Sequence, residues 1–265
     1  SVQSIAVSAA TLGSTVDLVE IGSIAQIASA GTWEVVLNTL NLGTVPAEAR
    51  MNFFGNDGNP LTLPWTFPQT PGTGTLMTSS LDRTINPGAL LVAETSGPDT
   101  QTASVGWGQL LGADGITGFG IFSNPKLKWE AVVPLDARNA SRYILAFDNT
   151  NGLSTGLAIA NLVAQAVAVQ VIIRDDAGAA VGTPLIQLPA LGHASFMLYE
   201  QYPITAARRG TIEFQTPSDG RISVLGLRAN GPALTTLPVL ADVGTGGGSI
   251  THVLFNGGFT QGTTL

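Results

Sequence analysis

The strongest constraint on how this chain can fold is an internal repeat, because repeated units of this length fold as copies of one another. A shift of 120 residues places Asn41, which ends the segment VVLNTLN, on Asn161, which ends GLAIAN. The same shift places FFGNDGNPL (residues 53–61) on IRDDAGAAV (residues 173–181), and both segments carry a Gly-containing turn at the same point. The repeat therefore predicts a duplicated module.

The openings of the modules repeat as well. IAQI (residues 24–27) lies 120 residues before ILAF (residues 144–147), and ITHV (residues 250–253) begins a third copy. Each opening is followed within a few residues by a Gly-containing turn. We expect two full modules and the first strand of another.

The later parts of the modules match as well, the first of them at a shift of 119 residues. TASVGWGQL (residues 102–110) resembles RISVLGLRA (residues 221–229). The closing segments GFGIF (residues 118–122) and TLPVL (residues 236–240) share apolar positions. Their common order supports one duplication that covers both modules.

Within the modules the apolar side chains alternate with a period of two, as in VAVQVII (residues 167–173), which is typical of half-buried strands. Turn signals such as Asp57-Gly58 separate segments of roughly 8–12 residues, which favours a β-sandwich, and Asp-Gly suits a type I′ hairpin turn. The predicted fold is all-β, with two duplicated immunoglobulin-like β-sandwich domains and extended terminal strands. The predicted organisation is an N-terminal extension with a possible strand (residues 1–23), module 1 (24–123), a linker strand (124–143), module 2 (144–240), and a Gly-rich spacer with a C-terminal strand (241–265).

The composition argues against several classes of protein. Charged residues make up 11% of the chain, and 18 acidic residues outnumber 11 basic ones, so a phosphate-binding surface is not expected. The absence of cysteine excludes thiol catalysis, disulfides and Cys-ligated zinc. No apolar run reaches the roughly 18 residues of a membrane span. The start at Ser1 fits a mature, processed protein and equally an excerpt of a longer chain, and we expect a secreted or cell-surface location.

Several of these segments resemble a known family. TGLAIAN, RDDAGAAVGTPLIQLPALGHASFML and GTIEFQTPSDGRISVLGLRANGPALTTLPVL, and likewise FFGNDGNPLTLP followed by ITGFGIFS, are similar to the tandem β-sandwich repeats of long secreted or cell-surface proteins of soil bacteria. The resemblance covers most of residues 24–240. It implies an extracellular β module and indicates neither a catalytic motif nor a particular ligand.

The candidates for chemistry are few, and no catalytic residue, cofactor or metal is predicted. His193 lacks the carboxylate and oxyanion partners of a Ser–His site, and His252 occupies a position that the other copies fill with Gln26 or Ala146. The acidic turns 56–59 and 175–176 could ligate calcium, but their equivalent places in the repeat favour hairpin turns. Trp107 is predicted to lie in the core. Trp65, between two prolines in LPWTFP, is the best candidate for an exposed ring that stacks on a sugar, although packing in the core or in an interface is favoured over ligand binding for it as well.

Two functions follow from these features, and neither is enzymatic. The first is a structural subunit of an extracellular filament or surface fibre, a homopolymer joined head to tail by strand exchange or module stacking. The alternative is a carbohydrate-binding or adhesin module. For strand exchange, the predicted assembly strand lies in residues 249–265, with the segment around Val16 and Ile21 as a possible acceptor. The apolar residues of the assembly strand are Ile250, Val253, Leu254, Phe255 and Phe259.

Overall fold

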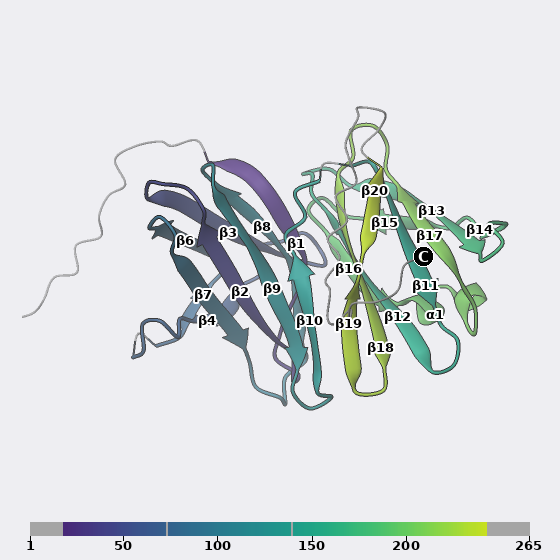
Figure 1. The fold of residues 1–265 in the computed structure, drawn as a ribbon, viewed down its shortest axis with the longest axis horizontal. Helices are drawn as coiled ribbons and strands as arrows, with labels where there is room; N and C mark the ends of the chain where they lie inside the picture. Colours follow the sequence, from purple (N-terminus) through teal and green to yellow (C-terminus); the bar gives the residue numbers. More distant parts are fainter. Residues whose placement is uncertain (1–17, 73, 139, 243–265) are drawn as a thin grey trace, which may run out of the picture.

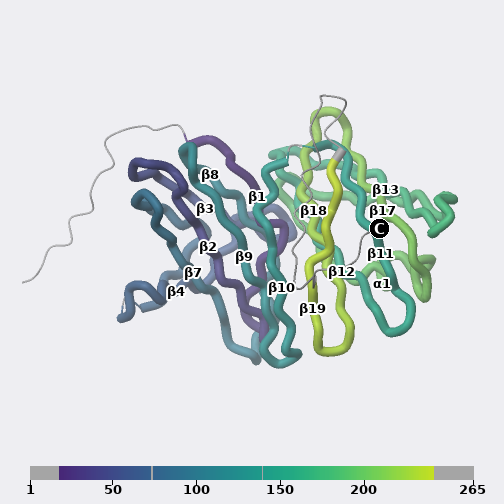
Figure 2. The backbone as a smooth tube through the Cα atoms, in the orientation of Figure 1, coloured from purple at the N-terminus to yellow at the C-terminus, as the bar shows by residue number. Residues whose placement is uncertain are grey.

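The computed structural model describes residues 18–72, 74–138 and 140–242 of the chain. The protein is all-β, with 62% strand and 3% helix. The two helical pieces in the described residues are α1 (Leu198–Gln201) and the 3-10 helix η1 (Pro203–Thr205). The strands form four small sheets, two from each half of the chain, and Figures 1 and 2 show the two halves side by side.

The first half of the chain forms two antiparallel sheets. Sheet A has the strand order β1-β8-β3-β6 and sheet C has the order β10-β9-β2-β7-β4-β5. The strands of sheet A are β1 (Val19–Ser29), β3 (Ala47–Gly55), β6 (Ser80–Ile85) and β8 (Ser104–Gly112). The strands of sheet C are β2 (Glu34–Asn41), β4 (Leu63–Thr66), β5 (Leu76–Thr78), β7 (Leu90–Ser96), β9 (Ile116–Asn124) and β10 (Trp129–Pro134).

The second half also forms two antiparallel sheets. Sheet D has the order β14-β13-β17-β11-β20, with β15 also paired to β13, and sheet E has the order β16-β12-β18-β19. The strands of sheet D are β11 (Arg142–Asp148), β13 (Val167–Asp175), β14 (Ala180–Gly182), β15 (Leu185–Leu188), β17 (Arg209–Gln215) and β20 (Val239–Asp242). The strands of sheet E are β12 (Leu153–Asn161), β16 (His193–Met197), β18 (Ile222–Asn230) and β19 (Ala233–Leu237).

The two halves share one strand order. The path β1-β8-β3-β6 in sheet A corresponds to β11-β17-β13-β15 in sheet D. The path β10-β9-β2-β7 in sheet C corresponds to β19-β18-β12-β16 in sheet E. Every strand of the first half therefore has a counterpart in the second half, except β4 and β5.

The shared buried asparagine is the clearest sign of this equivalence. Asn41 Nδ2 donates to the carbonyl oxygens of Val45 and Ile85, each at 2.8 Å, and Oδ1 accepts from the Gly43 amide. Asn161 makes the equivalent three bonds. Its Nδ2 donates to the carbonyl oxygens of Gln165 and of Pro189, directly after β15, and its Oδ1 accepts from the Val163 amide. Both side chains are fully buried. Each asparagine thus closes the loop that follows its strand.

The later sequence matches at a shift of 119 residues are wrong. Trp107 in β8 pairs with Phe54, and its counterpart in β17 is Thr211, which pairs with Arg174. The shift there is therefore 211 − 107 = 104 residues. The segment 221–229, which resembled β8, belongs to β18, the counterpart of β9. The reason is that the first half contains the extra β4–β5 hairpin, so the shift of 120 residues ends with β3 and β13.

The expectation of two immunoglobulin-like β-sandwiches is also wrong. The four sheets are arranged like the ring of a four-bladed β-propeller, but among the described residues no hydrophobic core cluster joins sheet C to sheet D. The halves are not independent, because the core of the first half includes Ala158 and Leu225 of sheet E. β1 is buried along most of its length for the same reason. A repeat in sequence reveals equivalent strands but does not reveal how strongly the copies pack on each other.

The expected boundaries fall inside strands of this continuous structure. β1 extends from Val19 to Ser29, across the boundary expected at residue 23. The predicted linker strand exists as β10, and it is the edge strand of sheet C. The segment after it returns to pair with β1, since Ser23 and Asp136 exchange backbone hydrogen bonds of 3.0 and 2.8 Å.

Candidate interaction surface

The two halves meet through a small third core. Trp107, Ala160 and Leu162 form one buried cluster, with Phe54 and Leu191 packed against it. The Trp107 ring stacks on Phe54 at 5.0 Å, and its Nε1 donates a hydrogen bond of 2.7 Å to the Leu191 carbonyl oxygen. Trp107 therefore lies in a core, as its strand context indicated. That core joins sheet A of one half to sheet E of the other.

His193 lies in the same contact between the halves and is buried. Its Nε2 donates to the Ala25 carbonyl oxygen at 3.0 Å, and its Nδ1 lies 2.8 Å from Oδ1 of Asn56. A neutral imidazole carries one N–H, so with Nε2 as the donor, Nδ1 is an acceptor. Exchanging the oxygen and nitrogen of the Asn56 amide lets its NH₂ group donate to Nδ1. Burial lowers the pKa of His193 from 6.5 to about 4, which keeps the ring neutral at pH 7. This histidine is a structural residue of the contact between the halves.

The turn after β3 docks on the turn before β16. At Gly58 a Cβ atom would lie 1.8 Å from the Ala190 carbonyl oxygen, so only glycine fits. Gly58 has a φ of +79°, while Asp57 has no positive φ, so the expected type I′ turn is not formed. The Asp57 carboxylate instead accepts bonds from the backbone and side-chain amides of Asn59, which lower the pKa of Asp57.

The equivalent turn of the second half uses its first aspartate in the same way. Asp175 Oδ1 accepts from the amides of Ala177 and Ala179 at 3.0 and 2.9 Å. Both acidic turns are therefore hairpin turns in which one carboxylate, that of Asp57 or of Asp175, accepts backbone hydrogen bonds. Within residues 18–242, apart from residues 73 and 139, no group of three or more His, Asp or Glu side chains could hold a metal ion.

The outer face of sheet E, which docks on sheet A, has a counterpart on the outer face of sheet C. Strand pairing shows which positions correspond. Asn38 corresponds to Ala158 at the shift of 120 residues, so their pairing partners Phe119 and Leu225 correspond as well. Three docked positions of sheet E have apolar and exposed counterparts. These pairs, with their exposed fractions, are Leu162 (6%) and Leu42 (70%), His193 (3%) and Leu90 (41%), and Leu225 (2%) and Phe119 (36%).

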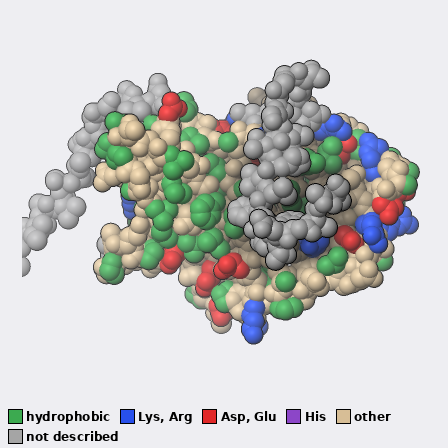
Figure 3. Space-filling view, viewed as in Figure 1, with side chains coloured by type: hydrophobic (Ala, Val, Ile, Leu, Met, Phe, Trp, Pro, Cys, Tyr) green, Lys and Arg blue, Asp and Glu red, His purple; other side chains and the backbone are tan. Residues whose placement is uncertain are grey.

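The exposed positions belong to a larger apolar face. Val132 on β10 pairs with Ile121 on β9, which pairs with Val36 on β2, and all three side chains point away from the core. Figure 3 shows hydrophobic side chains gathered over this part of the first half. A sheet face that is apolar in its centre and uncovered is typical of a contact surface. We call the outer face of β10, β9, β2 and β7 the free face.

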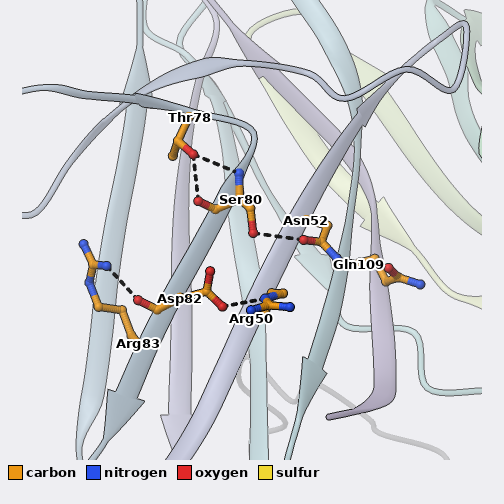
Figure 4. Close-up of polar contacts among 7 residues, drawn as sticks. All are labelled: Arg50, Asn52, Thr78, Ser80, Asp82, Arg83 and Gln109. Atoms are coloured by element: carbon orange, nitrogen blue, oxygen red, sulfur yellow. Dashed lines mark hydrogen bonds and ion pairs between the residues drawn. The ribbon is translucent and has the colours of Figure 1, made fainter. Parts of the chain in front are cut away.

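A second surface feature is a row of polar side chains on the outer face of sheet A. Figure 4 shows the row crossing β6, β3 and β8. Ser80 donates to Asn52 at 2.9 Å, Asn52 reaches Gln109 at 3.4 Å, and Arg50 pairs with Asp82 at 2.5 Å. Arg50 and Asp82 are largely exposed, so this polar row is open to solvent at its outer end.

A shallow groove of about 380 Å³ lies beside the β4–β5 hairpin. Its lining includes Phe67, Leu76 and Leu91, with the guanidinium of Arg83 4.6 Å from the centre of the Phe67 ring. The side chain of Gln69 is held by the backbone of β7 at both its amide nitrogen and its oxygen. Among the described residues that line the groove, apolar and uncharged polar side chains are joined by one cation, Arg83.

Trp65 does not provide the sugar platform expected from its sequence context. Its side chain is fully buried and stacks on Phe53 at 4.5 Å between sheets C and A. Side chains alternate along β4, so Leu63 and Trp65 both point into the core and Pro64 between them points away from it. Of the two interpretations of Trp65, core packing is therefore confirmed and the exposed stacking ring is wrong.

The predicted assembly strand, with Ile250, Val253, Leu254, Phe255 and Phe259, lies outside the described residues, as does His252. Of the proposed acceptor, Val16 lies outside the described residues; from Val19 onward β1 pairs with β8 along one edge, and Ser23 meets Asp136 at the other. The counterpart strand β11 is likewise covered by β17 and β20. The idea of a filament joined by a donor strand gains no support and is set aside.

Sequence reasoning missed the free face, although a signal for it was present. Leu42 follows Asn41 as Leu162 follows Asn161, so the 120-residue repeat already aligned the two leucines. The alignment could not reveal that one leucine is covered and the other exposed.

In the described part of the chain no helix is long and apolar enough to cross a membrane. No known family model, curated protein or solved structure matches this chain.

Proposed function

We propose that the chain is a structural module of an extracellular assembly, which works by stacking sheet faces and carries out no catalysis. The observation that supports it is the free face, which keeps apolar side chains exposed at positions equivalent to those buried between the two halves. Within the chain, the equivalent face of sheet E packs against the outer face of sheet A. The free face can make the same kind of contact with another molecule.

The energetic argument rests on the exposed apolar area. Leu42, Leu90 and Phe119 remain exposed in a chain that otherwise buries most of its large apolar side chains. Covering them removes apolar surface from water, which stabilises an association by about 25 cal/mol per Å² before the costs of association. A large aromatic side chain near the centre of such a face is typical of the residues that dominate binding.

The test is sedimentation velocity of the purified chain over a wide range of concentrations. We expect reversible self-association, and we expect Phe119→Asp to weaken it by roughly 30-fold, which corresponds to about 2 kcal/mol. The matched control is Ile204→Asp, which places the same charge at an exposed apolar position in η1, away from the free face. A chain that stays monomeric at every concentration would contradict the proposal.

A second candidate function is glycan binding, favoured by the polar row on sheet A. Arg50, Asn52 and Gln109 present planar donors and acceptors on one sheet face, and such groups pair with sugar hydroxyls. The test is a glycan array probed with the chain and with the Arg50→Ala variant. Binding that the variant loses would favour this function, and an array without signal would exclude it for the glycans presented.

A further inference from the structure

We infer that the free face docks on the outer face of β13, β17 and β11 of a second copy of this chain. The inference rests on the proposed stacking function and names its partner surface. Its starting point is the contact inside the chain, where the outer face of sheet E binds the outer face of sheet A. Sheet C is the counterpart of sheet E, and sheet D is the counterpart of sheet A. The chain therefore also carries a counterpart of each docked face. The counterpart of the sheet E face is the free face, which is uncovered, and the counterpart of the sheet A face is the outer face of sheet D.

The equivalence assigns individual contacts. Inside the chain, Leu162 shares a buried cluster with Trp107. The counterpart of Leu162 is Leu42, and the counterpart of Trp107 is Thr211, which is partly exposed on β17. Leu42 of one copy is therefore expected beside Thr211 of the next. The contact is less apolar than the internal one, so it is expected to be weaker and reversible.

Charge also favours this pairing over a pairing of two free faces. The free face carries Glu34, Glu94 and Glu130, so two such faces would bring six carboxylates together. The outer face of sheet D carries both signs of charge, and its acidic side chains are matched by basic ones, namely Arg142, Arg174 and Arg209 against Glu213 and Asp148. The acidic free face is therefore repelled less by this face than by a second copy of itself.

The turn after β13 is shaped for the same contact. Gly58 docks against Ala190 within the chain, whereas at its counterpart Gly178 a Cβ atom would meet nothing within 4 Å. Both glycines have a positive φ, of +79° and +87°. The second half therefore keeps the turn conformation that the first half uses for docking, with open space in front of it. The pairing is heterologous, so each pair of bound copies leaves one face of each kind available.

The test is chemical cross-linking, which is clean because the chain has no cysteine of its own. Leu42→Cys and Thr211→Cys are prepared as separate variants and treated with a short thiol-specific cross-linker, alone and mixed. We expect covalent dimers in the mixture and few in either variant alone. The control mixture combines Leu42→Cys with Ile204→Cys, whose cysteine is exposed outside the predicted contact. Thermal unfolding of each variant checks that the fold is kept.

The other outcomes overturn the inference in distinguishable ways. Dimers of Leu42→Cys with itself would show that two free faces pair, which refutes this partner surface but keeps self-association. Equal yields in the test and control mixtures would show collisional cross-linking and refute the assigned contact. No dimers, together with a monomer in sedimentation, would refute both this inference and the proposed function.

Discussion

Protonation of His193 is expected to weaken the contact between the halves under mildly acidic conditions. The buried ring is neutral, with a pKa lowered from 6.5 to about 4. A base whose pKa is lower in the folded chain than in the unfolded chain binds protons mainly on unfolding. Its contribution to stability is therefore complete above about pH 6.5 and is lost as the pH falls toward 4.

The magnitude follows from the size of the shift. A difference of about 2.5 pKa units corresponds to roughly 3 kcal/mol over the whole range, and about 2 kcal/mol of this is lost between pH 7 and pH 5. The carboxylates with lowered pKa values, such as Glu213, start from ordinary values of 4.5 or below, so they act at lower pH. The interval from pH 7 to pH 5 therefore isolates the histidine.

The assay is urea denaturation of the wild-type chain and of His193→Gln at several pH values across this interval. The variant cannot titrate, so the difference between the two free energies of unfolding is expected to shrink by about 2 kcal/mol from pH 7 to pH 5. A pH-independent difference would refute the reasoning. A difference that grows toward acid would show instead that the protonated ring donates to both of its neighbours.

Three further predictions concern stability. Trp65→Ala is expected to cost about 3–5 kcal/mol in urea denaturation, because it empties a buried site, and to leave any glycan binding of a folded sample unchanged. Trp107→Phe should cost about 1–3 kcal/mol, because a backbone carbonyl between the halves loses its donor; an unchanged midpoint would contradict this. Gly178→Ala should cost about 1–2 kcal/mol for its positive φ alone, and Gly58→Ala clearly more, because its Cβ meets Ala190; equal losses in thermal melts would argue against the docked turn.

Much of the strand pattern could be predicted from the sequence alone. Alternation of period two is set by the backbone of a strand, so it identified β13 and the all-β class without any tertiary information. The repeat likewise identified Asn41 and Asn161 as equivalent, because each needs only its own loop and one neighbouring strand to satisfy its amide. These features depend on residues close in the chain or on one copied pattern.

The tertiary structure alone decided which side of each strand is covered. Trp65 and Phe119 both lie on strands of sheet C, yet the first is buried against sheet A and the second is exposed. Leu42 and Leu162 follow the same asparagine in the repeat and still differ in exposure, because only the second half has a neighbouring half docked on that face. A strand has two faces of equal geometry, and burial of either one requires a partner sheet distant in sequence. The local pattern determined the strands of this protein, and the packing of one half on the other determined its internal contact and its free face.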